Sequence, residues 1–529
     1  ARQRLPRPET VAAGCRVGVS RRHGRAVPVH LADDLLRRQH TLAVAKTRAG
    51  KSTLLARIAR YLMEDDRQAV VLVDPQRDLA RQVLGLVPRE RADDVVFLDA
   101  ADRARPFGLN LLDAGLGWDR DQLVANLLFI FRREFAGFWG PRMEDAFRFA
   151  ALTLAEANGT LLALDPLGGR ERQYTALDVP ALLVAEPFRR TVLDLVADPE
   201  THDWWRRHWL ALREQLRQDS ANPVLTKVNK FKGSRPARAV IGQPASTIDP
   251  GAWLEGRKIV IVNTGAGEIG VDSSGLIGGT LVNLLKETVA AQQARDRAAR
   301  DRVTLLVDEF HLLPGADYAD LLAGQAKHGA NVHFATQSLA RLDRAPGDGE
   351  RALRDAVFDN IRGLFAFHTS AESARALMPE LGGEDEVDVE DLVSLDDYRC
   401  YMRVSRGAER LPAFLVDLEG PPVGDPAWAA RLAAASAARH GTPWERVDEL
   451  RRASLARIER AVQDARSRQA TGIEPLPRAA GPARRAPAGP AKAHNPQRRP
   501  KQRGLAGGRS GASSGAPGED TAWHGPDDA

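Results

Sequence analysis

Short apolar runs alternate with helical patterns in two parts of the chain. The first part has apolar runs near residues 41–45, 69–74 and 95–99, each followed by apolar residues at helical spacing. The alternation resumes near residue 258 and ends near residue 417. Continuous apolar runs of this length are typical of parallel strands that are buried on both faces. The pattern therefore predicts an α/β fold, with a mostly parallel sheet flanked by helices.

Between these two parts the apolar positions follow a helical period. The helical signal extends from Asp119 to Asp219 and is clearest in the runs 121–131 and 145–152. We therefore expect an all-helical insertion at residues 119–235. It divides the sheet domain into a first part, 41–118, and a second part, 236–420.

The two ends of the chain differ from its middle. Residues 1–40 form an Arg-rich N-terminal segment with short β-like runs such as 26–30. Residues 470–529 are rich in Gly, Pro, Ala and Arg, so we expect a disordered basic tail that is solvated, with transient contact to DNA or a partner protein as the alternative. Residues 421–469 have a C-terminal helical pattern, whose apolar positions we expect to pack on the core rather than on a partner helix: Leu450, Leu455, Ile458 and Val462.

The first junction between a strand and a helix carries a phosphate-loop pattern. The apolar run 41–44 precedes Ala45–Ser52, and a helical pattern follows at once. The segment departs from the full signature only at Ala45, where a glycine is usual; the alternative is a surface turn. Because backbone N–H groups and the helix dipole both point into such a turn, it binds phosphate.

Each residue type in this loop has an expected task. Gly50 lets the backbone close on the β-phosphate, Lys51 reaches the β/γ oxygens, and the hydroxyl of Ser52 is placed to bind Mg²⁺. The expected nucleotide-binding residues are Ala45, Lys46, Thr47, Arg48, Ala49, Gly50, Lys51, Ser52 and Thr53.

A second buried-strand pattern, Val303–Val307, ends in two carboxylates. We expect Asp308 to hold Mg²⁺ through water, together with Ser52. Glu309 follows by one residue, on the opposite side of an extended chain, where it would polarise the attacking water. The alternative, a solvated strand end, is less compatible with a phosphate loop upstream, so the pair favours hydrolysis over nucleotide binding alone.

A third apolar strand pattern, 330–336, ends at Gln337. A side-chain amide both donates and accepts hydrogen bonds, so Gln337 is suited to sense the γ-phosphate or to orient the water. Because open α/β sheets bind ligands at the carboxyl ends of their strands, we expect Gln337 to be a catalytic residue beside Lys51 and Glu309.

With these motifs in place, the chain resembles the HerA/FtsK-like translocases of the P-loop NTPase (RecA-like) class. Within them it is similar to the coupling proteins of type IV secretion. The similarity spans roughly residues 25 to 420 and rests on the order of these segments: Lys46–Ser52, Val73–Leu79, Pro106–Leu112, Ile241–Gln243, Lys258–Asn263, Asp308–Phe310 and Ala335–Ser338.

The resemblance implies a homo-hexameric ring that hydrolyses ATP with Mg²⁺ between neighbouring subunits and pulls DNA through its centre without regard to base sequence. It also implies relaxase and secretion-channel proteins at the membrane as partners. The neighbouring subunit would supply an arginine that stabilises the transferring phosphoryl group. Candidates are the arginines beside core strands or their loops: Arg238, Arg341 and Arg362.

Composition is compatible with this interpretation. The chain has 529 residues, a formal net charge of +5 and two cysteines, Cys15 and Cys400. Two cysteines so far apart build neither a disulfide framework nor a zinc cluster, so the cytoplasm is the expected compartment. No apolar stretch is long enough to span a bilayer, which leaves attachment to the inner face of the membrane to a partner or to an N-terminal anchor absent from this sequence.

Residues 265–270, Gly-Ala-Gly-Glu-Ile-Gly, spell a dinucleotide-binding motif, with Glu287 at the distance of a ribose contact. The polar residues 272–275 follow directly, so we expect no helix at the last glycine and a flexible loop instead. A dehydrogenase would also leave Lys51, Asp308 and Glu309 without a role.

The densest basic run surrounds Phe231 at the end of the helical insertion. Basic residues around an aromatic ring suit a phosphate backbone and an unstacked base, whereas the alternative is a solvated hairpin. The possible DNA contacts are Lys227, Lys230, Lys232 and Arg235, with Arg238 close by.

Two other functions stay open. A HerA-like repair or segregation motor would carry the same motor motifs. A nucleotide-gated assembly or binding protein would use ATP as a switch, without DNA transport, but Glu309 argues against a switch because it predicts hydrolysis.

Overall fold

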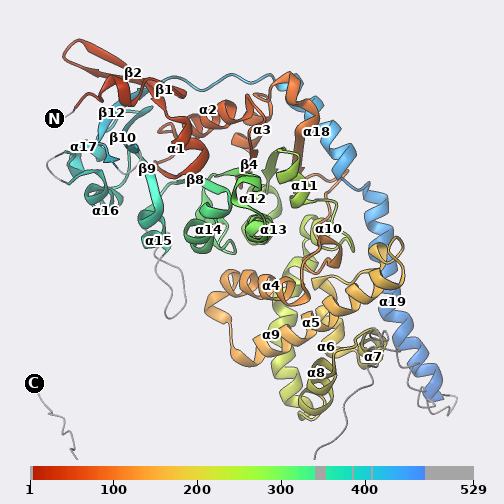
Figure 1. The fold of residues 1–529 in the computed structure, drawn as a ribbon. Coiled ribbons are helices and arrows are strands. Elements are labelled where there is room, and N and C mark those ends of the chain that lie inside the picture. The colour runs from red at the N-terminus through yellow and green to blue at the C-terminus, as the bar shows by residue number, and fades with distance from the viewer. Residues whose placement is uncertain (1–3, 340–352, 384–385, 407–408, 471–529) are drawn as a thin grey trace, which may run out of the picture. The chain divides into compact units, whose positions relative to one another are not determined.

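The structure is a computed structural model of the chain, and it describes residues 4–339, 353–383, 386–406 and 409–470 (Figure 1). Arg341 and residues 471–529 of the expected tail lie outside these ranges.

A single sheet organises the described chain. Its strands are β1 (Cys15–Arg22), β2 (Arg25–Leu31), β3 (His40–Val44), β4 (Ala69–Asp74), β5 (Val95–Asp99), β6 (Ile259–Asn263), β7 (Val303–Val307), β8 (Ala330–Thr336), β9 (Ile361–Ala366), β10 (Arg399–Arg406), β11 (Glu409–Arg410) and β12 (Phe414–Leu418).

The strand order is β2-β1-β12-β10-β9-β3-β8-β7-β4-β6-β5, with β11 paired to β10. From β9 to β5 every neighbouring pair is parallel, and from β9 to β2 every pair is antiparallel. The mostly parallel α/β sheet predicted from the sequence is therefore confirmed. Its central strands are buried at every position because helices cover both faces.

The helices are α1 (Asp33–Arg38), α2 (Lys51–Met63), α3 (Asp78–Leu84), α4 (Arg120–Glu134), α5 (Pro141–Leu164), α6 (Val179–Val184), α7 (Glu186–Leu193), α8 (Pro199–Asp203), α9 (Glu214–Gly233), α10 (Arg235–Ile241), α11 (Pro250–Glu255), α12 (Ala266–Ile269), α13 (Val271–Ala291), α14 (Tyr318–Gly324), α15 (Leu353–Asn360), α16 (Ala371–Leu381), α17 (Val389–Val393), α18 (Pro426–His440) and α19 (Trp444–Ala470).

Two hydrophobic clusters lie on the two faces of the sheet. Helices α2, α3 and α18 pack on one face, and α13 and α14 pack on the other (Figure 1). Helices α4 to α10, from the segment between β5 and β6, lie beyond α13 and extend the second cluster away from the sheet. Adjacent residues of β3 point to opposite faces: Leu42 belongs to one cluster and Ala43 to the other.

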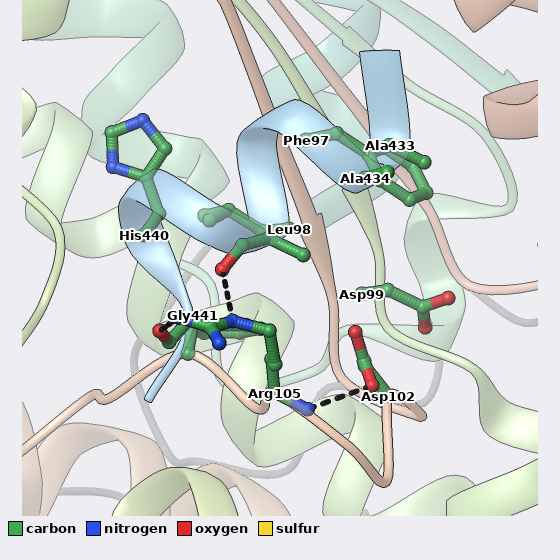
Figure 2. A pocket seen from close by; sticks show the side chains of 11 residues that line it. Phe97, Leu98, Asp99, Asp102, Arg105, Ala433, Ala434, His440 and Gly441 are labelled. Atoms are coloured by element: carbon green, nitrogen blue, oxygen red, sulfur yellow. Dashed lines mark hydrogen bonds between the residues drawn. The ribbon is translucent and has the colours of Figure 1, made fainter. Parts of the chain in front are cut away.

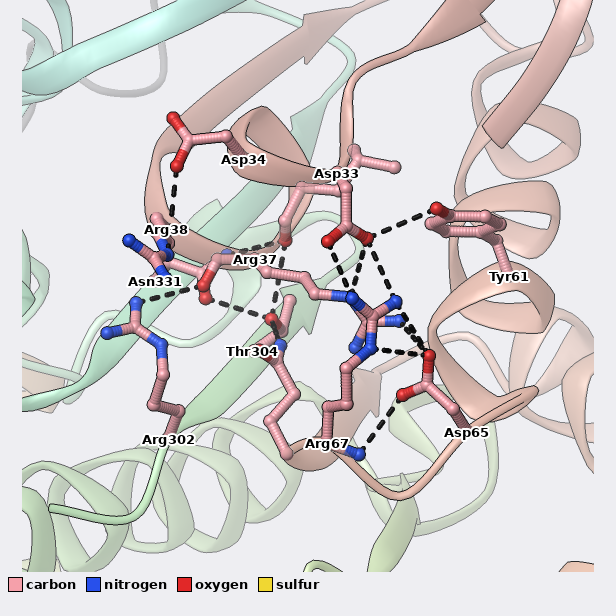
Figure 3. A network of polar contacts seen from close by, with 12 residues as sticks. Asp33, Asp34, Arg37, Arg38, Tyr61, Asp65, Arg67, Arg302, Thr304 and Asn331 are labelled. Carbon is pink, nitrogen blue, oxygen red and sulfur yellow. Dashed lines mark hydrogen bonds and ion pairs between the residues drawn. The ribbon is translucent and has the colours of Figure 1, made fainter. Parts of the chain in front are cut away.

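An ionic network fixes the amino-terminal edge of the sheet (Figure 3). Arg37 of α1 donates to Asp33 at 2.8 Å and to Asp65, just beyond α2, at 2.9 Å, and Arg67 donates to Asp33 at 2.8 Å. Burial raises the pKa of Asp33, but the hydrogen bonds from Arg37 and Arg67 outweigh it and hold that pKa below its usual range. The network holds the far end of α2, the helix that starts at the phosphate loop.

The structure corrects two expectations about helices. Helix α13 begins at Val271, directly after Gly270, where the sequence predicted a flexible loop. The C-terminal helical segment is broken between α18 and α19, and of its four apolar positions Ile458 packs against the core whereas Leu455 is 38% exposed.

Neither cysteine forms a disulfide, and both are buried. Burial raises the pKa of the Cys15 thiol to about 12. Among the described residues, no helix has both the length and the apolar character needed to cross a membrane.

Candidate active site

The phosphate-loop segment forms the turn between β3 and α2, as its pattern predicts. The backbone of Gly50 has a φ of 113°, a conformation that a side chain would strain. The loop is held from both sides: the Ala45 N–H donates to the carbonyl of Thr336 at 3.1 Å, and the Lys46 N–H donates to that of His368 at 2.8 Å. The first N–H groups of α2 have no partner within the helix and are therefore available to an anion.

Lys51 lies between the two carboxylates that end β7. Its Nζ is 2.8 Å from Asp308 Oδ1 and also pairs with Glu309 Oε1. The three side chains are only 8%, 5% and 1% exposed. Charges buried this deeply need partners, so the two carboxylates and the ammonium hold one another in place. Burial raises the pKa of Asp308, although the Lys51 ammonium acts against the shift.

Glu309 is turned back toward Lys51 by its backbone. Its φ of 44° lies in the left-handed region, so the chain is not extended there. The expectation that Asp308 and Glu309 lie on opposite sides of the chain is therefore wrong, and both contact the same ammonium. Such a conformation costs about 1–3 kcal/mol in a residue with a side chain and is often found at functional sites.

Gln337 contacts Glu309 through its backbone N–H group. Its N–H donates to Glu309 Oε2 at 3.2 Å, which brings the ends of β7 and β8 together. The structure thus joins three of the residues predicted from the sequence, Lys51, Glu309 and Gln337, at the carboxyl edge of the sheet.

His311 is a part of the site that the sequence analysis missed. Its Nδ1 is 3.4 Å from Glu309 Oε2 and 3.1 Å from the hydroxyl of Thr336, and its side chain is 6% exposed. The only signal in the sequence is a histidine placed two residues after Glu309, which does not by itself indicate a contact.

Asp74 ends the neighbouring strand, β4. It accepts hydrogen bonds from the N–H groups of Gln76 at 2.7 Å and Ala80 at 2.9 Å, and so shapes the loop that follows. Burial, followed by the charge of Asp308, raises the pKa of Asp74 to about 6.

Ser52 and Asp308 supply the kind of oxygen ligands that Mg²⁺ binds in nucleotide sites. Ser52 lies in the first turn of α2 and is partly exposed, while the Asp308 carboxylate contacts Lys51 of the same turn. Mg²⁺ keeps most of its ligands from water and phosphate, so one hydroxyl and one carboxylate fit it. Within the described ranges, no cluster of three or more His, Cys, Asp or Glu side chains forms a separate metal site.

Two of the three candidate arginines have a described position. Arg238 of α10 donates to the carbonyl of Lys232 at 2.6 Å, and Arg362 is exposed on β9. The third, Arg341, lies outside the described residues.

The basic run around Phe231 is helical and partly internal. Phe231 is fully buried, with its ring centroid 5.6 Å from that of Phe131, so it presents no face to a base and the expected stacking is wrong. Lys227 is also buried, and burial lowers its pKa. The run belongs to α9 and the start of α10, which excludes the solvated hairpin as well.

The other basic residues of this run are more accessible. Lys230 forms an ion pair with Asp272 of α13, and Lys232 is half-buried. The exposed Arg235 guanidinium lies over the Trp444 ring, 4.3 Å from its centroid.

Hydrogen bonds connect the loop at residues 265–270 to the carboxyl end of strand β4. The Thr264 N–H donates to the carbonyl of Asp74 at 3.1 Å, and the Ala266 N–H donates to that of Pro75 at 2.9 Å. Glu268 pairs with Arg77. These backbone donors are therefore engaged within the protein, although a helix does follow the last glycine.

A cavity of about 170 Å³ lies beside β5, the last strand of the sheet, between this strand and the end of α18 (Figure 2). Its Arg105 donates to the carbonyls of Ala437 at 3.0 Å and Gly441 at 3.4 Å. Because helix ends leave carbonyls unpaired, this arginine caps α18. The cavity is lined by Phe97, Leu98, Asp99, Asp102, Arg105, Phe107, Ala433, Ala434, Ala437, His440 and Gly441.

No protein-family model matches the chain, and no curated protein matches it in sequence. Solved structures do match. The bacterial conjugative coupling protein TrwB in an unbound form is 16% identical, with a TM-score of 0.57 over 80% of this chain and 95% of that one.

Two nucleotide complexes of the plasmid coupling protein TrwB also match. The complex with ADP and Mg²⁺ is 17% identical (TM-score 0.54, 75% of this chain and 90% of that one). The complex with the non-hydrolysable ATP analogue ADPNP is 18% identical (TM-score 0.53, 74% and 87%). This chain therefore has the fold of the coupling protein TrwB, a mostly parallel α/β sheet with a phosphate loop between a strand and a helix.

Proposed function

We propose that this protein is an ATP-hydrolysing DNA translocase that acts as a ring-forming coupling protein in conjugative DNA transfer through a type IV secretion system. The observation that carries the proposal is the buried contact of Lys51 with Asp308 and Glu309. It joins a phosphate loop to two carboxylates at the edge of a parallel sheet, where such folds bind ligands.

The residues divide the work of hydrolysis. Lys51 leaves the two carboxylates and neutralises the β- and γ-phosphates, while the N–H groups at the start of α2 cradle the β-phosphate. Glu309, released from Lys51, accepts the proton of the attacking water. The backbone N–H of Gln337 donates to Glu309, and this proximity supports a role for the Gln337 side chain in sensing the γ-phosphate beside that water.

Mg²⁺ would supply charge neutralisation at the phosphates, held by Ser52 and, through water, by Asp308. The TrwB complexes with ADP and Mg²⁺ and with ADPNP support ATP and Mg²⁺ as ligands, because they share the fold of this chain.

The wider proposal is a hexamer in which a neighbouring subunit contributes an arginine, with Arg362 the most accessible described candidate because it is exposed on β9. DNA passes through the ring, and relaxase and channel proteins meet it at the inner face of the membrane. TrwB is a conjugative, or plasmid, coupling protein, and the fold that this chain shares with it supports this role over a repair motor.

The test is steady-state ATP hydrolysis by the purified protein with and without DNA. We expect hydrolysis that Glu309→Gln abolishes and that DNA of any sequence stimulates. Hydrolysis without stimulation would contradict DNA transport, and ATP binding without hydrolysis would favour the nucleotide-gated switch.

A further inference from the structure

Tyr398 is an unusual residue beside the phosphate loop. It precedes β10, its φ of 61° lies in the left-handed region, and the residue is 40% exposed. A bulky residue in that region is a genuine outlier and persists only where the surroundings hold it. Two backbone hydrogen bonds do so: its N–H donates to the carbonyl of Ala49 at 3.0 Å, and its own carbonyl accepts from the Leu418 N–H at 2.8 Å.

The Tyr398 ring lies against the loop at Gly50. A Cβ on Gly50 would meet Tyr398 Cδ1 and Cα at 3.3 Å and Phe367 Cε1 at 3.2 Å. Phe367 is fully buried, whereas Tyr398 keeps much of its surface open to solvent. The strained backbone thus holds an aromatic ring in contact with the loop that receives the phosphates, and leaves part of that ring uncovered.

The strand order gives the direction of a bound nucleotide. Asp308 and Glu309 end β7, which lies two strands from β3 on one side; β9 and then β10 lie on the other side. A γ-phosphate beside the carboxylates and a β-phosphate at Gly50 therefore direct the rest of the nucleotide away from β7. That direction leads toward Tyr398, which the backbone holds in contact with the loop.

We propose that the ring of Tyr398 stacks on the base of the bound nucleoside triphosphate. This inference rests on the proposed function and names the residue that receives the base. Aromatic stacking accepts any base because every base has a π-face, so the residue would favour nucleotides over bare polyphosphates without choosing between adenine and guanine.

The test compares three variants in equilibrium binding of ATP, GTP and inorganic tripolyphosphate, each with Mg²⁺. Tyr398→Gly removes the ring but suits the positive φ, so it keeps the backbone unstrained. Tyr398→Phe keeps the ring. Phe138→Ala removes an aromatic ring that is 82% exposed in the helical region and serves as the matched control.

We expect Tyr398→Gly to weaken ATP and GTP binding about fivefold or more, with tripolyphosphate affinity unchanged. Tyr398→Phe and Phe138→Ala should bind all three ligands as the wild type does. Unchanged nucleotide affinity in Tyr398→Gly, or an equal loss for tripolyphosphate, would overturn this inference alone. A wild-type protein that binds neither ATP nor tripolyphosphate would overturn the proposed function as well.

Discussion

Two charged regions were predicted from the sequence to be functional sites, and they differ in how the structure arranges their charges. At the carboxyl edge of the sheet, Lys51, Asp308 and Glu309 bring opposite charges together in a buried site. In α9, Lys227 and Lys230 carry like charges that are dispersed, one buried and one paired with Asp272.

The difference lies in what fixes each group. Lys51 lies at the start of a helix, and Asp308 and Glu309 follow the end of a strand. Because both positions lie at the same edge of the sheet, these motifs in the sequence predict that the three charges come together. The basic run has no such constraint, because its density in sequence says nothing about which side of a helix each residue occupies. Charge patterns therefore predict function well only where a backbone motif positions them.

The largest effect is expected for Lys51→Ala. The loop backbone supplies no mobile cation, and the variant leaves two buried carboxylates without their partner, so kcat/KM for ATP should fall about 1,000-fold or more. Steady-state kinetics on protein shown to be folded by circular dichroism measures this, with the exposed Lys327→Ala as control. Near-normal turnover would place the site elsewhere.

Glu309→Gln should separate binding from chemistry. The amide keeps the shape of the side chain but does not take a proton from water, so kcat should fall about 100-fold or more while ATP stays bound. Equilibrium binding and single-turnover hydrolysis report the two steps. Loss of ATP binding with an unchanged rate per bound nucleotide would make Glu309 a structural residue.

Phe231→Ala tests whether the centre of the basic run is core. Phe231 is fully buried against Phe131 and Phe135, so its truncation should lower the free energy of unfolding by about 3–5 kcal/mol. Exposed Phe138→Ala should change it by less than about 0.5 kcal/mol. Urea denaturation measures both, and a stable Phe231→Ala protein with weakened DNA binding would restore the stacking role.

The smallest effect is expected for the accessible part of the basic run. Replacing Lys230, Lys232 and Arg235 by Ala should lower the salt dependence of DNA binding, because each lost phosphate contact removes about one counterion from the release. Basal ATPase activity should persist. DNA affinities of the wild type and the variant at several salt concentrations measure this. An unchanged slope of affinity against salt concentration would show that the segment does not contact DNA.

The sequence predicted the parallel strands closely because their apolar runs are continuous and local. The run predicted at residues 69–74 is β4, and the one at 95–99 is β5. The meeting of Lys51, Asp308, Glu309 and Gln337 follows from the same strand ends.

What the sequence did not predict depends on tertiary contacts. The left-handed turn at Glu309 is held by its contacts with Lys51 and Gln337, which no local pattern encodes. The start of α13 after Gly270 was missed because polar residues in the first turn of a helix look like a loop. Phe231 is buried by the rings of Phe131 in α4 and of Phe135 just after it, which are distant in sequence.

The most direct test of ATP-driven DNA movement is displacement of streptavidin from the biotinylated end of a DNA strand, measured with single- and double-stranded substrates. We expect displacement by the wild-type protein with ATP and Mg²⁺, none with a non-hydrolysable analogue, and none by Glu309→Gln. If the wild-type protein hydrolyses ATP and binds DNA but leaves streptavidin in place on both substrates, the claim that this site drives translocation is contradicted.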